Sequence, residues 1–456
     1  MPHGDDELLH ARALPEPTLT FTLPSIHDGL ALDCRVYHPF SLSISPRAPP
    51  WQRHAAIVAH PYAPLGGSQD DHIVDIVAST LLRLGYLVCT FNFRGASGSA
   101  GRTSWTARAE RADYMSVAGF VAHYVHFLDP FRQAQPTTEQ IPKQEENKTS
   151  PVLLLAGYSY GAMITSQLPS LDTMLSSFRT PINGSPAAEI RLRAEYMADT
   201  ENTVLASARA AALDRQNTRS PRKAMAMRVG GDEQNRKSHE MGRRSFSLDA
   251  EEKFRDLIAK TRKGHRAALS VSSLPKKPST TVIRSVADEQ AKKEAETHIQ
   301  PLSAMTRFQP AYLLVSPLQG IVTHLATMSF LNPFGKKTAG APTRTPSHAG
   351  HHGTRPAPDT DPAVVGWEAH HKLVDNPTFA VYGDQDIFVP VKKLRHWARR
   401  LQEVPDSRFR AHEISSAGHF WAEGKVLYLM RDAVRVFAES LLSLEPRPLE
   451  LKVEEE

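Results

Sequence analysis

Cysteine is almost absent from this sequence, which has only two in 456 residues, Cys34 and Cys89. Both lie in strand-like apolar runs, and two thiols provide no disulfide framework. This excludes the class of small secreted domains that disulfides hold together, and it favours a reducing compartment. The acidic start of the chain also lacks the apolar core of a signal peptide. We therefore expect a cytoplasmic protein.

Long hydrophobic runs are missing as well. The most apolar stretch, residues 311–330, is interrupted by Pro317, Gly320 and His324, so it predicts a buried strand and helix rather than a membrane span.

Metal and nucleotide motifs are also lacking. The histidines near residue 350 (His348, His351 and His352) have no carboxylate or thiolate at a matching spacing. The glycine-rich run at residues 94–101 lacks the G-x-G-x-x-G spacing and the Lys-Ser/Thr ending of a phosphate loop. We expect a turn there, with Arg94 paired to Glu110 or Asp113. The sequence therefore predicts no metal and no cofactor.

Positive charge is concentrated in one part of the chain. Residues 201–308 contain 22 Lys+Arg, 13 Asp+Glu and only three aromatic residues. Such a segment buries little apolar surface, so residues 172–308 are predicted to be a largely disordered insertion or a cap. With so few aromatic residues among the basic ones and no recognisable binding motif, we expect no binding of nucleic acid. A second irregular loop, rich in Pro, Gly and His, is predicted at residues 335–362.

The remaining residues, 17–171 and 309–445, alternate strand-like and helix-like segments. Apolar runs such as 87–93 and 151–159 predict buried strands. The segment 70–86 has apolar residues at helical spacing and predicts an amphipathic helix. This alternation is typical of an α/β fold with a mostly parallel sheet and helices on both faces. We therefore predict one discontinuous domain that the insertion interrupts after the helix at 160–168.

The strongest chemical signal is Gly157-Tyr158-Ser159-Tyr160-Gly161. This G-x-S-x-G motif follows an apolar strand and begins a helix, which is the context of a nucleophile elbow. The glycines permit the sharp turn that exposes the serine above the sheet edge. Ser159 is therefore the predicted nucleophile, and a tight turn with an incidental serine is the alternative.

A serine nucleophile needs a base that an acid orients, and in this fold the acid and then the histidine follow the serine along the chain. Two carboxylates, Asp384 and Asp386, lie at the end of the strand-like run 378–383, where parallel sheets bind their ligands. The residues alone do not separate them. His419 lies in the loop after the last expected strand and is the predicted base.

The loop at residues 60–67 is the expected oxyanion loop, because it follows a strand and precedes a helix, as does the loop that gives the second N–H donor beside a nucleophile elbow. Pro61 and Pro64 have no N–H to donate. The second donor is therefore Tyr62 or Ala63, and we favour the Tyr62 backbone. The first donor is predicted to be the backbone N–H of Tyr160.

Four segments together resemble a group of small, poorly characterised α/β-hydrolases: the run from residue 60 to 102, GYSYGA, YGDQDIFVP and AGHFW. The group has a dipeptidyl-peptidase-like Gly-Tyr-Ser-Phe/Tyr-Gly elbow, and the resemblance covers roughly residues 54–165 and 309–440. It implies the α/β-hydrolase fold and the triad Ser159, Asp386 and His419. Its acid is the aspartate of a Gly-x-x-Asp-x-x-Val-Pro pattern, which fits Asp386 rather than Asp384.

The predicted function is a serine hydrolase that cleaves a small ester or thioester through an acyl-enzyme. A dipeptidyl-peptidase-like amide hydrolase is the enzymatic alternative. A non-catalytic scaffold that presents the basic insertion is the alternative from another class. The expected partner is a small acyl substrate, and the sequence indicates no oligomeric state.

Overall fold

The computed structural model describes residues 14–104, 106–131, 150–218, 297–302, 304–319 and 371–443. Most of the insertion expected at 172–308 and the whole loop expected at 335–362 lie outside these residues. Among the described helices, none is long and apolar enough to span a membrane.

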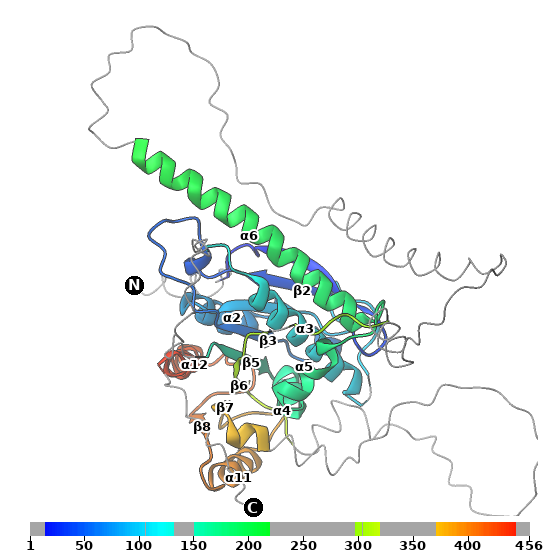
Figure 1. The fold of residues 1–456 in the computed structure, drawn as a ribbon. Helices are drawn as coiled ribbons and strands as arrows, with labels where there is room; N and C mark the ends of the chain where they lie inside the picture. Colours follow the sequence, from blue (N-terminus) through cyan, green and yellow to red (C-terminus); the bar gives the residue numbers. More distant parts are fainter. Residues whose placement is uncertain are drawn as a thin grey trace, which may run out of the picture.

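One eight-stranded sheet runs through the centre of the molecule (Figure 1). Its strand order is β1-β2-β4-β3-β5-β6-β7-β8. The first two strands pair antiparallel with each other, β2 pairs antiparallel with β4, and every later pair is parallel. The strands are β1 (Leu19–Pro24), β2 (Ala31–Tyr37), β3 (Ala55–Ala59), β4 (Leu87–Phe91), β5 (Val152–Tyr158), β6 (Gln309–Val315), β7 (Thr378–Gly383) and β8 (Phe409–Ile414).

Helices cover both faces of this sheet. One face packs against α2 (His72–Arg83) and α12 (Val426–Leu442). The other packs against the remaining helices, and Figure 1 shows the two groups on opposite sides. Successive residues of a strand point to opposite faces, so Ile57 of β3 belongs to one core and Val58 to the other. The helices of the second face are α3 (Arg108–Phe127), α4 (Tyr160–Gln167), α5 (Leu171–Arg179), α6 (Pro186–Thr218) and α11 (Val391–Gln402).

This architecture is the α/β-hydrolase fold, and the predicted fold class is confirmed. The sequence could predict it because strands buried on both faces are continuous apolar runs. All seven residues of β5 are buried, for example.

Residues 172–218 are the start of the segment for which we expected a largely disordered insertion or a cap, and here the structure differs from the first of these two expectations. These residues form α5 and α6. Ile190, Ala194, Met197 and Ala198 of α6 are buried in the core beside α3. A count of aromatic residues misses this helix, because small and aliphatic side chains at helical spacing are enough to bury one face.

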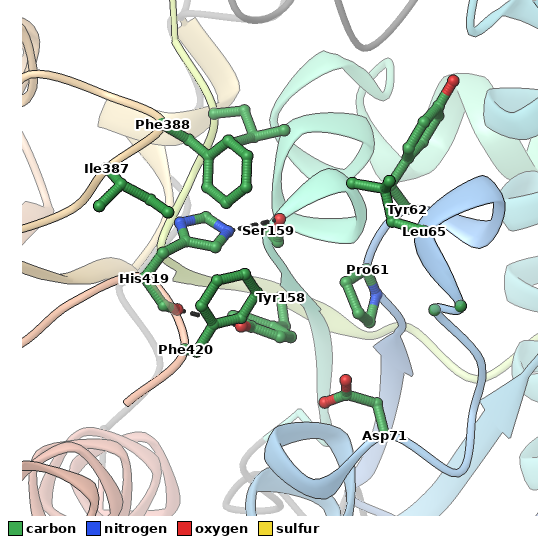
Figure 2. A pocket seen from close by; sticks show the side chains of 13 residues that line it. Pro61, Tyr62, Leu65, Asp71, Tyr158, Ser159, Ile387, Phe388, His419 and Phe420 are labelled. Carbon is green, nitrogen blue, oxygen red and sulfur yellow. Dashed lines mark hydrogen bonds between the residues drawn. The ribbon is translucent and has the colours of Figure 1, made fainter. Parts of the chain in front are cut away.

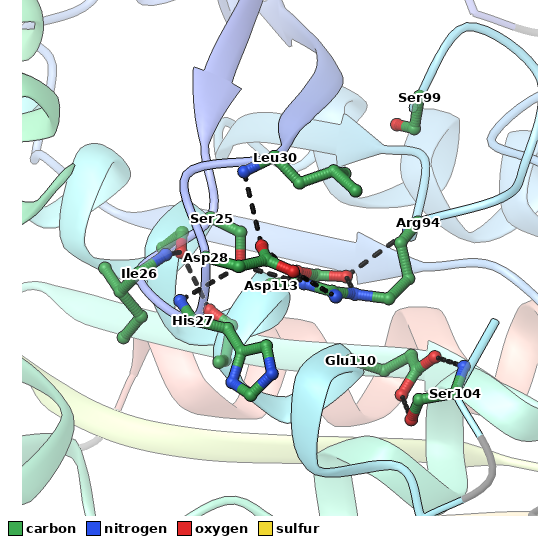
Figure 3. Close-up of polar contacts among 12 residues, drawn as sticks. Ser25, Ile26, His27, Asp28, Leu30, Arg94, Ser99, Ser104, Glu110 and Asp113 are labelled. Carbon is green, nitrogen blue, oxygen red and sulfur yellow. Dashed lines mark hydrogen bonds and ion pairs between the residues drawn. The ribbon is translucent and has the colours of Figure 1, made fainter. Parts of the chain in front are cut away.

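Polar contacts of Arg94 fix the chain where it leaves β4 (Figure 3). The guanidinium forms an ion pair with the fully buried Asp113 of α3 at 2.6 Å and another with Asp28 at 2.9 Å. Of the two partners expected for Arg94, Asp113 is therefore the correct one. Glu110 instead accepts hydrogen bonds from the backbone and hydroxyl of Ser104. The loop after β4 is thus tied to α3 and to the turn between β1 and β2.

Candidate active site

Ser159 lies at a sharp turn between β5 and α4. Its backbone has φ 55° and ψ −112°, a conformation that costs energy for any residue with a side chain. The two motif glycines allow this turn. A Cβ atom on Gly157 would lie 2.3 Å from the Gly161 carbonyl carbon, and one on Gly161 would lie 2.5 Å from the Ala59 carbonyl oxygen. The geometry is that of a nucleophile elbow.

Three of the residues singled out in the sequence lie in one chain of hydrogen bonds. His419 Nε2 is 2.8 Å from Ser159 Oγ (Figure 2). His419 Nδ1 is 2.6 Å from Asp386 Oδ2. The side chains of His419 and Asp386 are almost completely buried. A carboxylate can only accept, so Nδ1 carries the proton and donates it to Asp386. Nε2 then has a free lone pair that accepts the serine hydroxyl.

Asp386 and Asp384, two residues apart, have different partners. Asp386 Oδ1 accepts backbone hydrogen bonds from Phe388 at 2.8 Å and Val389 at 3.0 Å, which leaves Oδ2 for the histidine. Asp384 Oδ1 instead accepts the Ser416 N–H at 2.7 Å. The fold therefore brings Asp386 to His419, and Asp384 links two loops.

The loop after β3 lies beside the elbow. Tyr160 is the first residue of α4, so its N–H has no acceptor within the helix. Tyr62 precedes a short 3₁₀ turn (Ala63–Leu65), and its ring packs against the Tyr160 ring with centroids 5.1 Å apart. Pro61 and Tyr62 line the cavity at Ser159, whereas Ala63 does not. The sequence left Tyr62 and Ala63 as the two possible backbone donors, and of these Tyr62 is the one that lines the cavity.

A cavity of about 490 Å³ opens at Ser159 and His419 (Figure 2). Its mouth exposes three large apolar side chains, with Leu65 and Ile387 each 75% exposed and Phe420 59% exposed. Inside, the Phe388 ring packs edge-on against the His419 ring at 4.6 Å. The residues that line the cavity are Pro61, Tyr62, Leu65, Gly66, Gly67, Asp71, Tyr158, Ser159, Leu318, Ile387, Phe388, His419 and Phe420.

Sequence reasoning did not identify this apolar wall. Ile387, Phe388 and Phe420 directly follow Asp386 and His419 in the chain, and that adjacency was the available signal. The described part of α5 and α6 contributes no residue to the lining, so this part of the segment expected to be an insertion or cap does not cover the site.

One further carboxylate lines the cavity, that of Asp71. It caps the start of α2, where its Oδ1 accepts the N–H of Ile73 at 2.9 Å. Burial raises the pKa of this carboxyl group. Within the described residues, no group of three metal-ligating side chains occurs.

No protein-family model matches the chain, and neither does any curated protein. The chain is similar to solved structures that include an α/β serine hydrolase homologue from Coxiella burnetii, with 12% identity over 93% of this chain and 98% of that one and a TM-score of 0.39. An α/β serine hydrolase without a lid from Xanthomonas campestris is 16% identical over 95% and 100% of the two chains, with a TM-score of 0.38.

Est1E from Butyrivibrio proteoclasticus, solved with ferulic acid bound, is 11% identical over 93% of this chain and 100% of that one, with a TM-score of 0.39. Similarity at this level carries no argument about function. The fold assignment rests on the strand order and the elbow described above.

Proposed function

We propose that this protein is a serine hydrolase that cleaves an ester or thioester of an apolar acyl group. The observation that supports this most directly is the hydrogen-bonded chain of Ser159, His419 and Asp386, whose serine and histidine line an apolar cavity. A non-catalytic scaffold has no need for a strained serine backbone in contact with an oriented imidazole, because such strain costs on the order of 1–3 kcal/mol.

In the proposed reaction, Ser159 Oγ attacks the carbonyl carbon of the substrate while His419 Nε2 takes its proton. Asp386 keeps the imidazole in the required tautomer and stabilises its positive charge. The N–H groups of Tyr160 and Tyr62 bind the oxyanion of the tetrahedral intermediate. His419 then gives the proton to the leaving alcohol or thiol, and water releases the acid by the same steps in reverse.

The cavity supports an apolar acyl group as the substrate class. Burial of each methylene against such a wall contributes about 0.8 kcal/mol, and the wall here is made of Leu65, Leu318, Ile387, Phe388 and Phe420. The second candidate is a dipeptidyl-peptidase-like amidase. Asp71 favours it, because a carboxylate in the cavity is the kind of group that binds a substrate ammonium.

The test is labelling by a fluorophosphonate probe followed by hydrolysis of p-nitrophenyl esters from acetate to decanoate. We expect the wild type to be labelled and Ser159→Ala to be unlabelled. Ser166→Ala is a matched control, because its hydroxyl lies on the same helix and, among the described residues, bonds only to the Met163 carbonyl. We expect kcat/KM to rise with acyl length and to exceed that for dipeptide p-nitroanilides. Labelling of Ser159→Ala, or no labelling of the folded wild type, would refute the proposal.

A further inference from the structure

His60 follows β3 directly and is completely buried. Both of its ring nitrogens lie within hydrogen-bond distance of the backbone. Nε2 is 2.9 Å from the Phe93 nitrogen in the loop after β4. Nδ1 is 2.6 Å from the Pro61 carbonyl oxygen. The ring therefore links Phe93, in the loop that Arg94 holds, to Pro61 in the oxyanion loop.

These two partners determine the position of the ring proton. A backbone N–H can only donate, so Nε2 accepts from Phe93. A carbonyl oxygen can only accept, so Nδ1 carries the proton and donates it to Pro61. Burial lowers the pKa of His60 to about 4, so the ring is neutral near pH 7. His60 therefore has one tautomer, and this tautomer holds the Pro61 carbonyl.

The Pro61 carbonyl and the Tyr62 N–H belong to the same peptide plane. None of the described peptide bonds is cis, and in a trans peptide these two groups point in opposite directions. A bond that fixes the carbonyl toward His60 therefore directs the Tyr62 N–H away from it. The next plane is held separately, because the Tyr62 carbonyl accepts the N–H groups of Leu65 and Gly67.

We propose that His60 is a positioning residue for catalysis, which holds the Pro61–Tyr62 peptide so that the Tyr62 N–H faces the oxyanion. This inference rests on the proposed function. Without the bond from Nδ1, the plane rotates about ψ of Pro61 and φ of Tyr62. Such a rotation replaces a hydrogen-bond donor by a carbonyl oxygen at the place where negative charge develops, which removes one oxyanion contact and adds repulsion.

Two substitutions separate this role from simple packing. The side-chain nitrogen of asparagine reaches the position of Nδ1, so His60→Asn keeps the bond to Pro61 and loses the one to Phe93. The side-chain oxygen of glutamine reaches the position of Nε2, so His60→Gln keeps the bond to Phe93 and loses the one to Pro61. Each variant removes one hydrogen bond to the backbone, so their melting temperatures should be similar.

The experiment compares kcat and KM for a p-nitrophenyl ester with the Ki of a trifluoromethyl ketone, whose serine adduct carries the oxyanion. Loss of one oxyanion donor costs about 10²–10³-fold in kcat. We expect His60→Gln to lower kcat about 100-fold and to raise Ki by a similar factor, with little change in KM. His60→Asn should stay within about fivefold of the wild type.

Gly67→Ala provides a second route to the same carbonyl. A Cβ at Gly67 would lie 2.4 Å from the Pro61 oxygen, so it displaces the peptide while His60 stays intact. We expect the same loss in kcat and Ki. A lower kcat and a higher Ki in Gly67→Ala would support the role of the Pro61–Tyr62 peptide even if His60→Gln folds poorly.

Equal losses in both His60 variants, or a change in KM without one in Ki, would overturn the role of His60. In that case the fluorophosphonate would still label the wild type. Failure of the proposed function would instead appear as an unlabelled wild type.

Discussion

Replacement of Asp386 by asparagine tests the proposed acid with almost no change in shape. Asp386 Oδ1 accepts two backbone N–H groups, from Phe388 and Val389. The asparagine must keep its oxygen there, because its amino group would otherwise face two donors. The amino group then faces His419 Nδ1. That nitrogen can only accept from it, so the ring proton moves to Nε2, where it prevents the imidazole from taking the proton of Ser159.

The magnitude follows from this exchange of tautomers. A wrong tautomer at a serine–histidine–aspartate site costs about 10⁴-fold in kcat, which corresponds to about 5.4 kcal/mol of transition-state stabilisation. The two backbone hydrogen bonds remain, so the free energy of unfolding should change by only about 1 kcal/mol. Steady-state hydrolysis of a p-nitrophenyl ester measures kcat, and a thermal melt of the same preparation measures the change in stability.

Asp384→Asn is the matched control, because it makes the same chemical change two residues away. The amide oxygen can still accept the N–H of Ser416, so kcat should stay within a few-fold and stability should fall by up to about 1 kcal/mol. If Asp384→Asn abolishes turnover and Asp386→Asn does not, then the acid is Asp384 and the argument from the hydrogen bonds is wrong.

Two further predictions concern stability. Burial lowers the pKa of His60 and of His123 to about 4, so below about pH 6.5 each of these two rings is protonated in the unfolded chain but neutral in the folded one. As the pH falls from 6.5 to 4, each ring should therefore lower the free energy of unfolding by up to about 1.4 kcal/mol per pH unit. Urea unfolding at several pH values measures the slope, and an unchanged slope in His60→Asn would contradict this prediction. From composition, residues 205–300 bury little apolar surface, so their deletion is predicted to leave the fold intact. However, Arg209 near the end of α6 donates hydrogen bonds to two backbone carbonyls of the loop before β3. We therefore expect the deletion of residues 205–300 to lower the melting temperature, and a deletion of residues 219–296, which keeps Arg209, to leave it nearly unchanged. Equal melting temperatures of the two deletion variants would show that the end of α6 contributes nothing to stability.

The amino-acid sequence was sufficient for the features that depend on local patterns. Apolar runs and helical spacing predicted the strands and helices, and their alternation predicted the layered fold. The elbow was also predictable, because the glycines and the serine that make the turn lie within five residues of one another. The segment 172–218 was not predicted, because its partner for burial is α3, which lies far away in the sequence.

The site needed the tertiary structure wherever its parts are distant in sequence. Ser159 and His419 are 260 residues apart, and the choice between Asp384 and Asp386 depends on which carboxylate the folded loops turn toward that histidine. The tautomer of His60 likewise depends on Phe93, which another strand brings to it. By itself the sequence determined which residue types could do chemistry and on which elements they lie. The tertiary structure decided which of them meet, because hydrogen bonds require partners within about 3 Å and only the packed sheet sets such distances.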